Sequence, residues 1–435
     1  MKHAIHRRQF LKQTAIFTAA AAAHQQFHSL RAASSPGNKI VLAVMGANGR
    51  GSELIKGFSA LDGVEIGYVC DVDERAMAKG INAAGNKQSK VPHGLKDFRR
   101  ALDDRTVDAL VIAAPDHWHA PATILACAAG KHVYVEKPAS HNPREGEMMV
   151  AAARKFNRVV QLGSQRRSMP GVVEAIEKLR AGEIGKVFFS RGWYTNTRGS
   201  IGRGKRAPVP AWLDFSLWQG PAPEHEFRDN LVHYNWHWFW HWGTGELGNN
   251  AIHALDVCRW GLGVDFPRRV TSGGGRYHFQ DDQETPDTSI VSFDFGDKVI
   301  AWEGRSCQPR GIEGSSFGIS FHGEKGSLVC DGANYKIYDL NNKEIGSGSG
   351  SGSDRPHLQN FLDCIRNGRR PNADIEEGHK STLLCHLGNI AYRVGGAVET
   401  DPRTGHIRNN SAAAALWGRK YRPGWAPQDY RSVKT

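Results

Sequence analysis

Lys137 is the residue whose type and position point most directly to chemistry. It belongs to the run Glu136-Lys137-Pro138, which follows the short, apolar, strand-like segment 133–135. A lysine at the C-terminal end of a parallel strand in a nucleotide-binding sheet points into the ligand crevice, and the fixed φ of Pro138 stiffens the peptide that carries it. An ammonium group held there can bind and polarise a substrate hydroxyl. The tripeptide alone is commonly a surface turn, so its interpretation depends on the elements around it.

A glycine-rich turn supplies the candidate nucleotide site. It lies between a strand-like run and a helical pattern, and its glycines permit a tight turn and a close approach of backbone N–H groups to a pyrophosphate at the helix N-terminus. Asn48 stands where the usual fingerprint has its second glycine, and asparagine tolerates the left-handed region better than most side chains do. The predicted cofactor-binding residues of this turn are Gly46, Asn48, Gly49, Arg50 and Gly51.

An acid follows the next strand-like run. Asp71 comes 20 residues after Gly51 and directly after Cys70. A carboxylate at this place accepts hydrogen bonds from the adenine ribose and repels a 2′-phosphate, which favours NAD over NADP. The alternative is an ordinary strand-end aspartate that stabilises a turn. The glycine turn and Asp71 together predict a dinucleotide site with NAD as its cofactor.

Strand and helix patterns alternate in the first part of the chain and give way to longer strands in the second. Alternation with short connections predicts an α/β fold that begins with a doubly wound parallel sheet, a Rossmann domain over residues 37–163. A second α/β domain with a large open, mostly antiparallel sheet is predicted over 164–435, and the Gly-Ser alternation of 346–353 is expected to form a flexible surface loop. The expected strands are 40–44, 64–69, 109–113, 132–135, 159–162, 186–196, 268–279, 288–296, 298–306, 316–322 and 326–331. The expected helices lie near 51–60, 73–84, 120–129, 143–156, 170–181, 355–367 and 376–394.

These elements together resemble the family of glucose–fructose oxidoreductase and inositol dehydrogenase, Gfo/Idh/MocA. The resemblance covers nearly the whole mature chain and rests on the order of the glycine turn, Asp71, the run 114–119, Glu136-Lys137-Pro138, and the run 243–246 that leads to His253. It implies a sugar, polyol or glycoside as substrate and a homo-oligomer formed through the open sheet. By this resemblance Lys137 is the catalytic lysine and His253 the acid/base histidine. The cofactor pocket is expected to include Pro115, His117, Trp118, His119, Glu136 and Gln165 as well.

Position 249 departs from the family pattern. Many members have an aspartate four residues before the histidine, whereas this chain has Asn249, so a Lys-Asp-His triad cannot be assumed. An asparagine cannot carry charge or take a proton, although it can orient a hydroxyl. Asp256, three residues after His253, either fixes the tautomer of the imidazole or caps a turn. Arg166, at the domain junction, either reaches the substrate or cofactor or forms a structural salt bridge.

Tryptophans are concentrated in one segment, because seven of the twelve lie between residues 193 and 242. From Trp236 to Trp242 they occupy every second position, so in an extended segment four rings share one face. Such a face suits the C–H face of a pyranose, and the alternative is core packing with an interface. The histidines 233, 237 and 241 have the spacing of a helical metal site, but the period-two pattern argues against a helix and no metal is predicted. The candidate substrate residues are Arg166, Tyr194, Trp236, His237, Trp240, Asn249 and Asp256.

The first 34 residues have the pattern of an export signal. Arg7-Arg8-Gln9-Phe10-Leu11-Lys12 precedes an apolar stretch, 14–23, and small residues near Ala32. This resembles a twin-arginine signal, with His6 where Ser or Thr is more usual, and the apolar stretch is too short to span a bilayer stably. The alternative is a frayed basic N-terminus. We expect a periplasmic or otherwise extracytoplasmic protein with no membrane anchor after export.

The charge of the chain excludes one class of partner. The formal net charge is +12, and five of these positive charges lie within residues 1–34, which leaves about +7 for the rest. No basic cluster is combined with a DNA- or RNA-reading motif, so we expect no nucleic-acid partner.

The expected location constrains the chemistry, because free NAD is not expected to be plentiful outside the cytoplasm. The leading hypothesis is an exported NAD(H)-dependent oxidoreductase that acts on a sugar, polyol or glycoside by hydride transfer and retains its cofactor. The second is a redox-neutral glycoside hydrolase, in which oxidation, elimination, hydration and reduction follow one another on one cofactor. The third is a non-catalytic sugar-binding protein, which Asn249 keeps open.

Overall fold

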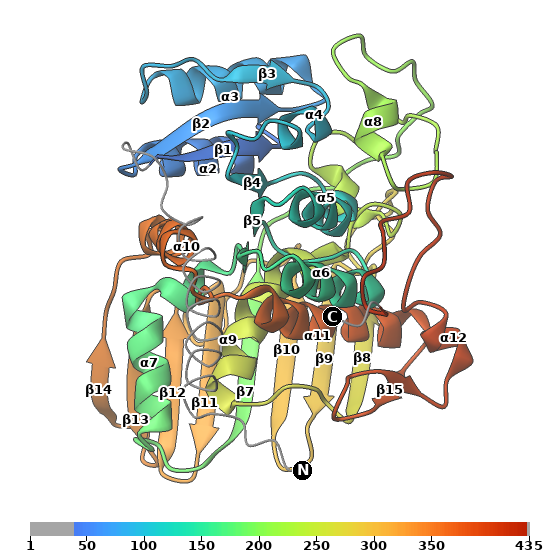
Figure 1. Ribbon diagram of the computed structural model, residues 1–435. Coiled ribbons are helices and arrows are strands. Elements are labelled where there is room, and N and C mark those ends of the chain that lie inside the picture. Colours follow the sequence, from blue (N-terminus) through green and yellow to red (C-terminus); the bar gives the residue numbers. More distant parts are fainter. Residues whose placement is uncertain (1–38, 433–435) are drawn as a thin grey trace, which may run out of the picture.

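Two β-sheets organise the protein. The computed structural model describes residues 39–432, and the predicted export signal, 1–34, lies outside the described residues. A six-stranded sheet lies at the top of Figure 1 and a ten-stranded sheet at the bottom, with helices α6 and α11 between them. The fold is therefore the predicted α/β arrangement of a parallel nucleotide-binding sheet and a second, mostly antiparallel sheet.

The first sheet is parallel throughout and has the strand order β3-β2-β1-β4-β5-β6. This is the doubly wound order, in which the ligand crevice opens beyond the carboxyl ends of the strands at the switch point between β1 and β4. Strand β4 is buried along its whole length, as its continuous apolar sequence indicates. The strands are β1 Ile40–Met45, β2 Val64–Cys70, β3 His93–Leu95, β4 Ala109–Ile112, β5 His132–Val135 and β6 Val160–Leu162. The helices are α2 Arg50–Ser59, α3 Glu74–Gly85, α4 Arg99–Leu102, α5 Asp116–Ala128 and α6 Pro143–Lys155.

The second sheet has the order β14-β13-β12-β11-β7-β10-β9-β8-β15-β16, and only its central pair, β7 and β10, is parallel. Its strands are β7 Val187–Thr195, β8 Arg269–Gly275, β9 Thr288–Asp294, β10 Val299–Arg305, β11 Phe317–Gly323, β12 Gly326–Asp331, β13 Asn334–Asp339, β14 Glu344–Gly348, β15 Ala397–Thr400 and β16 Ile407–Arg408. The remaining α-helices are α7 Pro170–Arg180, α8 Phe215–Gln219, α9 Ile252–Leu262, α10 Arg355–Asn367, α11 Ile375–Arg393 and α12 Ser411–Ala414. Short 3₁₀ turns, η1 Gln165–Ser168 and η2 Asn235–Trp238, and a π-helical turn, η3 Leu247–Ala251, complete the described elements.

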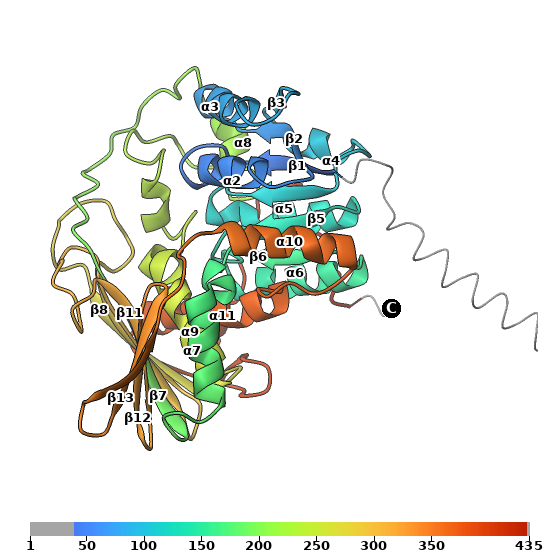
Figure 2. The same ribbon diagram turned by 90° about the vertical axis from the view of Figure 1, so that its left-hand side faces the viewer.

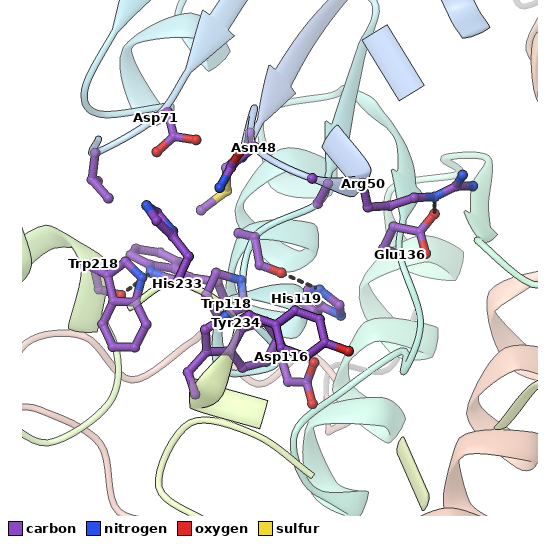
Figure 3. A pocket seen from close by; sticks show the side chains of 18 of the residues that line it. Asn48, Arg50, Asp71, Asp116, Trp118, His119, Glu136, Trp218, His233 and Tyr234 are labelled. Carbon is purple, nitrogen blue, oxygen red and sulfur yellow. Dashed lines mark hydrogen bonds and ion pairs between the residues drawn. The ribbon is translucent and has the colours of Figure 1, made fainter. Parts of the chain in front are cut away.

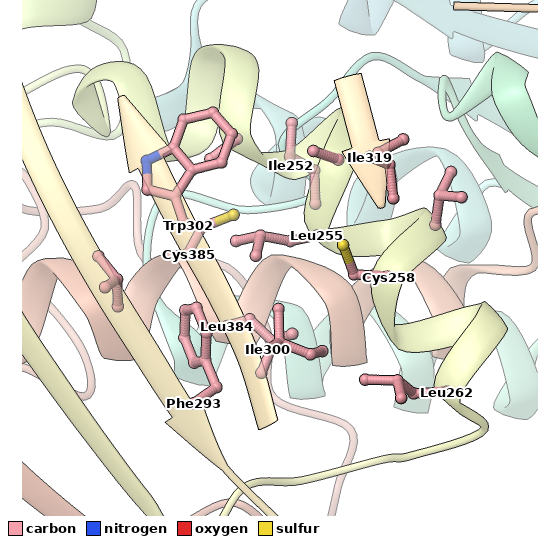
Figure 4. Packing of buried hydrophobic residues seen from close by; sticks show 14 of the residues in the cluster. Ile252, Leu255, Cys258, Leu262, Phe293, Ile300, Trp302, Ile319, Leu384 and Cys385 are labelled. Carbon is pink, nitrogen blue, oxygen red and sulfur yellow. The ribbon is translucent and has the colours of Figure 1, made fainter. Parts of the chain in front are cut away.

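The main core lies between this sheet and the helices on one of its faces. Phe293, Ile300 and Trp302 from the sheet pack against Leu255 of α9 and Leu384 of α11, and all five are buried (Figure 4). Each such side chain stabilises the fold by about 1.5–3 kcal/mol relative to exposure. This core holds α9 in place, and α9 carries His253 into the site.

The two late helices join the two halves of the molecule. Helix α10 returns to the first domain, where Leu358 and Phe361 pack with Phe58 and Tyr134 (Figure 2). Helix α11 contacts α6 on one side and β8 with α9 on the other. The junction between the sheets is therefore packed rather than a simple linker.

The predicted Gly-Ser loop, 346–353, is only partly a loop. Residues 346–348 belong to β14 and pair with β13. Beyond the strand, a Cβ on Gly350 would lie 2.5 Å from the backbone nitrogen of Gly171, so this part of the chain packs closely against the start of α7. The prediction of a flexible surface loop is wrong for residues 346–350, because small residues here serve close backbone packing.

Residues 196–246 leave the second sheet and cross to the first domain; we call them the covering segment. They have a small apolar core of their own, which includes Leu213, Phe215, Trp218 and Trp242. The backbone N–H of Asp214 donates to the carbonyl of Val72, two residues after the end of β2, at 3.0 Å. The covering segment therefore lies against the carboxyl edge of the parallel sheet, where the nucleotide crevice opens. Among residues 39–432, no helix is both long and apolar enough to cross a membrane.

Candidate active site

A cavity of about 440 Å³ opens at the carboxyl ends of the parallel strands (Figure 3). Its volume is within the usual range of small-molecule and cofactor sites. Its wall comes from the loops after β1, β2, β4 and β5, from the start of α9, and from the covering segment. The predicted site residues that line it are Gly46, Asn48, Gly49, Arg50, Asp71, Pro115, Trp118, His119, Glu136, Lys137, Gln165, Trp236, His237, Asn249 and His253.

The glycine turn forms one end of the cavity. Gly46 has φ 86°, and a Cβ there would lie 2.6 Å from the carbonyl oxygen of Ala113, so a side chain is excluded on both counts. Gly51 lies behind the turn, where a Cβ would come within 1.8 Å of the Gly46 carbonyl oxygen. Helix α2 begins at Arg50, so its N-terminus faces the cavity and favours a negatively charged group.

Asp71 connects the glycine turn to the end of β2. Its Oδ2 accepts from the backbone N–H of Ala47 at 2.7 Å, and its Oδ1 accepts from that of Asp73 at 2.9 Å. Burial raises the pKa of Asp71, while these two N–H groups act in the opposite direction. The carboxylate is thereby held in one orientation at the cavity wall, as a ribose-binding group requires.

Lys137 is anchored at the other end of the cavity. Its Nζ donates to the backbone oxygen of Asn249 at 2.7 Å and to the Oδ1 of the same residue at 3.0 Å. Burial lowers the pKa of Lys137, while the carboxylates of Glu136, Asp116 and Glu246 oppose this shift. Asn249 lies on the π-helical turn that precedes α9, an irregularity that is frequent at functional sites. The site therefore presents an oriented ammonium group with one of its three donors left over.

His253 lines the same cavity from α9, four residues after Asn249. Burial, together with the positive charges of Arg166, Lys137 and Arg50, holds the pKa of His253 well below its usual value. The imidazole is therefore neutral at pH 7, so one ring nitrogen can accept a hydrogen bond or a proton. Its Nδ1 is buried and makes no hydrogen bond among the described residues.

Glu136 and Arg50 form an ion pair across the cavity wall. Arg50 Nε donates to Glu136 Oε1 at 2.7 Å (Figure 3). Arg50 Nη1 donates to Asp354 Oδ2 at 2.5 Å. The pair joins the glycine turn, the end of β5 and the start of α10. Glu136 therefore positions the cavity wall, and its carboxylate is already bound.

Two family models match the chain in succession. The NAD-binding Rossmann-fold model of the oxidoreductase family matches residues 40–164, and the C-terminal alpha/beta-domain model of the same family matches residues 192–427. The chain belongs to the Gfo/Idh/MocA oxidoreductase family. The family match agrees with the two sheets and with the nucleotide crevice at the end of the first sheet.

Individual relatives in the family are distant. The chain is 28% identical to a levoglucosan dehydrogenase of Pseudarthrobacter phenanthrenivorans over 38% of this chain and 36% of that one. It is 32% identical to a glycosyl hydrolase family 109 protein of Saccharopolyspora erythraea over 35% of this chain and 34% of that one. These alignments span only about a third of each relative. A solved levoglucosan dehydrogenase in complex with NADH and levoglucosan superposes with a TM-score of 0.66 at 18% identity, covering 83% of this chain and 99% of that one, which shows a shared fold.

Besides Gly51, which lies behind the glycine turn, five of the predicted site residues do not line the cavity, namely His117, Tyr194, Arg166, Trp240 and Asp256. His117 is buried, and its Nε2 lies 2.9 Å from the carbonyl oxygen of Trp218. Tyr194, on β7, contacts Asn196 through its hydroxyl. Arg166 stacks over the ring of Phe317 at 4.2 Å, and no salt bridge of its guanidinium is found among residues 39–432. Trp240 faces a separate, smaller recess.

Asp256 also lies outside the cavity, and neither role predicted for it is found. Arg167 donates to both of its carboxylate oxygens, with Nη2–Oδ1 at 2.8 Å and Nε–Oδ2 at 2.9 Å. Ser381 Oγ donates to Oδ1 at 2.6 Å. The carboxylate therefore belongs to a buried ionic cluster beneath the site and does not touch the imidazole of His253.

The tryptophan-rich segment is not extended, which corrects the prediction of one shared aromatic face. Residues 235–238 form a 3₁₀ turn, and Trp238 and Trp242 are buried in the protein. Only Trp236 of the four rings lines the cavity, stacked on His237 with ring centroids 3.6 Å apart. In the described part of the chain, no group of three or more His, Cys, Asp or Glu side chains is placed to hold a metal ion.

Several cavity residues are not predicted from the sequence. Trp218, His233 and Tyr234 come from the covering segment, and Asp116 comes from the first position of α5 (Figure 3). His233 Nε2 lies 2.8 Å from Asp73 Oδ2, which fastens the covering segment beside the end of β2. Only Asp116 has a sequence signal, since it belongs to the run 114–119 that carries part of the family resemblance.

Proposed function

We propose that this protein is an NAD(H)-dependent oxidoreductase that oxidises a C–OH group of a sugar, polyol or glycoside by hydride transfer. The observation that carries the proposal is one cavity with a glycine turn and Asp71 at one end and Lys137 with His253 at the other. Membership of the oxidoreductase family supports it, as does the similarity to a relative named levoglucosan dehydrogenase.

The nucleotide end of the cavity fits a dinucleotide. The glycine turn leaves room for a pyrophosphate at the N-terminus of α2, and Asp71 presents a fixed carboxylate where a ribose would lie. A 2′-phosphate would be repelled by that carboxylate, so we propose NAD rather than NADP. When bound, the nicotinamide supplies the hydride acceptor.

The residues at the other end have complementary roles. Two donors of the Lys137 ammonium bind Asn249, which leaves the third for the substrate oxygen. A positive charge at that oxygen stabilises the alkoxide character that develops as the hydride leaves the adjacent carbon. The neutral imidazole of His253 takes the hydroxyl proton, and Asn249 orients the lysine instead of accepting a proton.

We further propose that the protein is exported through the twin-arginine route with its cofactor already bound. The sequence of residues 1–34 supports export. The covering segment supports retention, because it contributes Trp218, His233 and Tyr234 to the cavity wall and is fastened beside β2. We therefore propose that this segment slows the release of the cofactor.

Redox-neutral cleavage of a glycoside is the second candidate. Transient oxidation of a ring hydroxyl acidifies the neighbouring C–H, an aglycone is eliminated, water adds and the hydride returns, so no second electron acceptor is needed. The similarity to a relative named as a glycosyl hydrolase family 109 protein favours it. So does the covering segment, since retention of the cofactor is what such a cycle requires.

Native mass spectrometry of the purified protein, followed by a panel of sugars and aryl glycosides, tests both candidates. Bound NAD(H) and stoichiometric NADH absorbance with a sugar support plain oxidation. Release of aglycone without NADH accumulation supports the redox-neutral cycle, and Lys137→Met should abolish either signal. A protein that neither contains nor binds NAD(H) would refute the proposal, and bound cofactor that no sugar reduces would indicate a binding protein.

We also propose a homo-oligomer formed through the second sheet. Helices α7, α9 and α11 lie on one face, and the other face is left without helices in Figures 1 and 2. Ile290, on β9, points from that face and is 62% exposed. Light scattering coupled to size exclusion tests this, and Ile290→Lys should shift the protein toward the monomer.

A further inference from the structure

Burial lowers the pKa of Lys137, and the carboxylates of Glu136, Asp116 and Glu246 oppose this shift. Two of the three, Glu136 and Glu246, are bound to an arginine. Glu136 accepts from Arg50 at 2.7 Å. Glu246 pairs with Arg198 and also accepts from Asn250 Nδ2 at 2.5 Å. The charge of each is therefore largely balanced by a neighbour other than Lys137.

Asp116 is the third carboxylate, and it has no such partner. Among residues 39–432, no Lys, Arg or His nitrogen lies within 4.0 Å of it in a salt bridge. It is only 2% exposed, yet it lines the cavity (Figure 3). Its one side-chain hydrogen bond comes from Thr244 Oγ1, which donates to Oδ2 at 2.6 Å. Burial raises the pKa of Asp116, while the charges of His119 and Lys137 and the hydrogen-bonding groups of Thr244 act in the opposite direction. A buried carboxylate whose hydrogen-bond donors come from one neutral residue is costly, and a functional role would explain its presence at the site.

Asn249 defines what that role must be. The side chain that touches the Lys137 ammonium is an amide and carries no charge. A buried ammonium without a nearby anion loses its proton readily, and a neutral amine would no longer stabilise an alkoxide. Lys137 therefore needs a negative charge from elsewhere in the cavity.

We propose that Asp116 is a positioning residue that supplies this charge and keeps Lys137 protonated, in place of an acid at position 249. The inference rests on the proposed hydride-transfer function and deepens it. Thr244 holds the carboxylate at the cavity wall. Asp116 acts through Lys137, and it takes no proton from the substrate.

Other charged and titratable groups also face Lys137, and they set the background. Glu136, Glu246 and Asp116 raise its pKa, whereas Arg50 lowers it. The imidazoles of His253 and His237 lie close enough to feel the lysine charge, and burial holds the pKa of each below its usual range. His119 faces Asp116, with Nδ1 2.6 Å from the Pro138 carbonyl oxygen and Nε2 2.8 Å from that of Ala114. Neutralising Glu136 or Glu246 would leave an arginine without one of its anions, whereas neutralising Asp116 breaks no salt bridge among the described residues.

The test is the pH profile of kcat/KM for Asp116→Asn on the best sugar of the panel. Since the lysine acts as an ammonium, activity falls as pH rises through its pKa. Loss of the Asp116 charge lowers that pKa, so the alkaline limb should move to lower pH by about one unit, with about a tenfold loss above the limb. The double variant D116N/N249D returns a carboxylate to a position already 3.0 Å from the lysine and should move the limb back.

The outcomes separate this inference from the proposed function. An inactive wild-type protein would refute the function itself. An active wild-type whose Asp116→Asn variant binds NADH normally but keeps its alkaline limb would overturn the inference, and so would failure of the double variant to restore the limb. If Asp116→Asn does not fold, Thr244→Val decides. Loss of the hydroxyl should move the limb down while Thr244→Ser leaves it in place, and equal limbs in these two variants would also overturn the inference.

Discussion

Two clusters of charged and titratable groups lie along helix α9, and they are built differently. In the first, Asp256 binds Arg167 and Ser381. Arg259 binds Glu377 and, with an Nη1–Oδ1 distance of 3.1 Å, Asp265. In this ionic cluster every cation has an anion. In the second, the Lys137 ammonium is hydrogen-bonded only to Asn249, which carries no charge, and no salt bridge of Lys137 or His253 is found among residues 39–432. The first arrangement stabilises the fold. The second leaves one donor of Lys137 and a ring nitrogen of His253 free for a ligand.

The difference shows how one helix serves two purposes. The pKa of Glu377 lies at about 2, because the arginines and Lys380 outweigh the effect of its burial. The pKa values of His253 and Lys137 are lowered instead, since burial is not offset by a bound anion. Perturbation of the second kind is typical of groups that must exchange a proton or bind a changing charge. The ionic cluster fixes α9 so that these groups keep their positions.

Removing an anion from the ionic cluster should have the largest effect, which is a loss of stability. Asp256→Ala leaves the Arg167 guanidinium buried with only a 3.5 Å contact to Glu377. Loss of one partner of a buried pair costs about 3–5 kcal/mol in the free energy of unfolding. Thermal melts and urea titrations measure the loss, and kcat of the protein that stays folded should change little.

Asp265→Ala is the matched control for that prediction. Asp265 pairs with Arg259 in the same ionic cluster, but the side chain of Asp265 is 55% exposed. The pair therefore contributes less than about 1 kcal/mol to the free energy of unfolding. Equal destabilisation by the two variants would contradict the distinction between the buried cluster and its exposed rim.

Removing Lys137 should have the opposite effect, a loss of activity without a loss of stability. Lys137→Met should lower kcat/KM about 10²–10³-fold, because the developing negative charge loses its electrostatic partner. Stability should be kept or raised, since a buried cation is replaced by an apolar side chain of similar length. Steady-state kinetics and a thermal melt on the same preparation measure both.

Lys131 is a buried lysine without a catalytic position. Its Nζ donates to the carbonyl oxygens of Asp104 at 2.7 Å and Val107 at 2.9 Å, and none of these three residues lines the cavity. Lys131→Met should lower stability and leave kcat/KM unchanged. If it lowers activity as much as Lys137→Met does, the assignment of chemistry to Lys137 fails.

The same contrast explains how much the sequence could predict. Lys137 and Asp71 follow short apolar strands whose ends can be located from local pattern, so these residues and the parallel sheet are predicted, whereas His253 is assigned through the family resemblance. The roles of Asp256 and Arg166 could not be predicted, because each is set by a residue distant in the sequence. Ser381 binds Asp256, and Arg166 stacks on Phe317.

Local pattern fails where packing overrides it. The Trp236–Trp242 alternation predicts an extended segment, but the rings of Trp238 and Trp242 bury themselves by turning the chain. Strand β14 has one hydrophobic residue, Ile345, and it is exposed, so no alternating pattern reveals the strand. Its glycine and serine residues pair with β13 through their backbones. His233 enters the cavity wall through a long-range contact with Asp73 that no sequence spacing reveals.

Asp71 combines features of both arrangements. Its carboxylate is hydrogen-bonded to the backbone, as in the ionic cluster, and it also lines the cavity, as Lys137 does. Asp71→Asn keeps an acceptor for the Ala47 N–H but removes the charge that repels a 2′-phosphate. The ratio of NADPH to NADH dissociation constants should fall about tenfold, which corresponds to ~1.4 kcal/mol. Fluorescence titration with the two reduced cofactors measures the ratio. An unchanged ratio would assign cofactor choice to another residue.

The smallest effect is expected at the edge of the covering segment. His233→Ala removes the 2.8 Å contact to Asp73, which is partly exposed and worth about 0.5–1 kcal/mol, so NADH should dissociate about two- to fivefold faster. His225 is an exposed histidine of the same segment that lies against His241, and His225→Ala should leave the rate unchanged.

The pH dependence of NADH dissociation gives a second measure of the same contact. Although burial acts to raise it, hydrogen bonds from Arg75 and His233 lower the pKa of Asp73 to about 2. A depressed carboxylate pKa stabilises the closed segment above the ordinary value near 4 and loses this effect as the pH falls toward 2. Dissociation measured by stopped flow should therefore accelerate across that window in the wild type and less so in His233→Ala, and parallel profiles would show that the contact does not hold the segment closed.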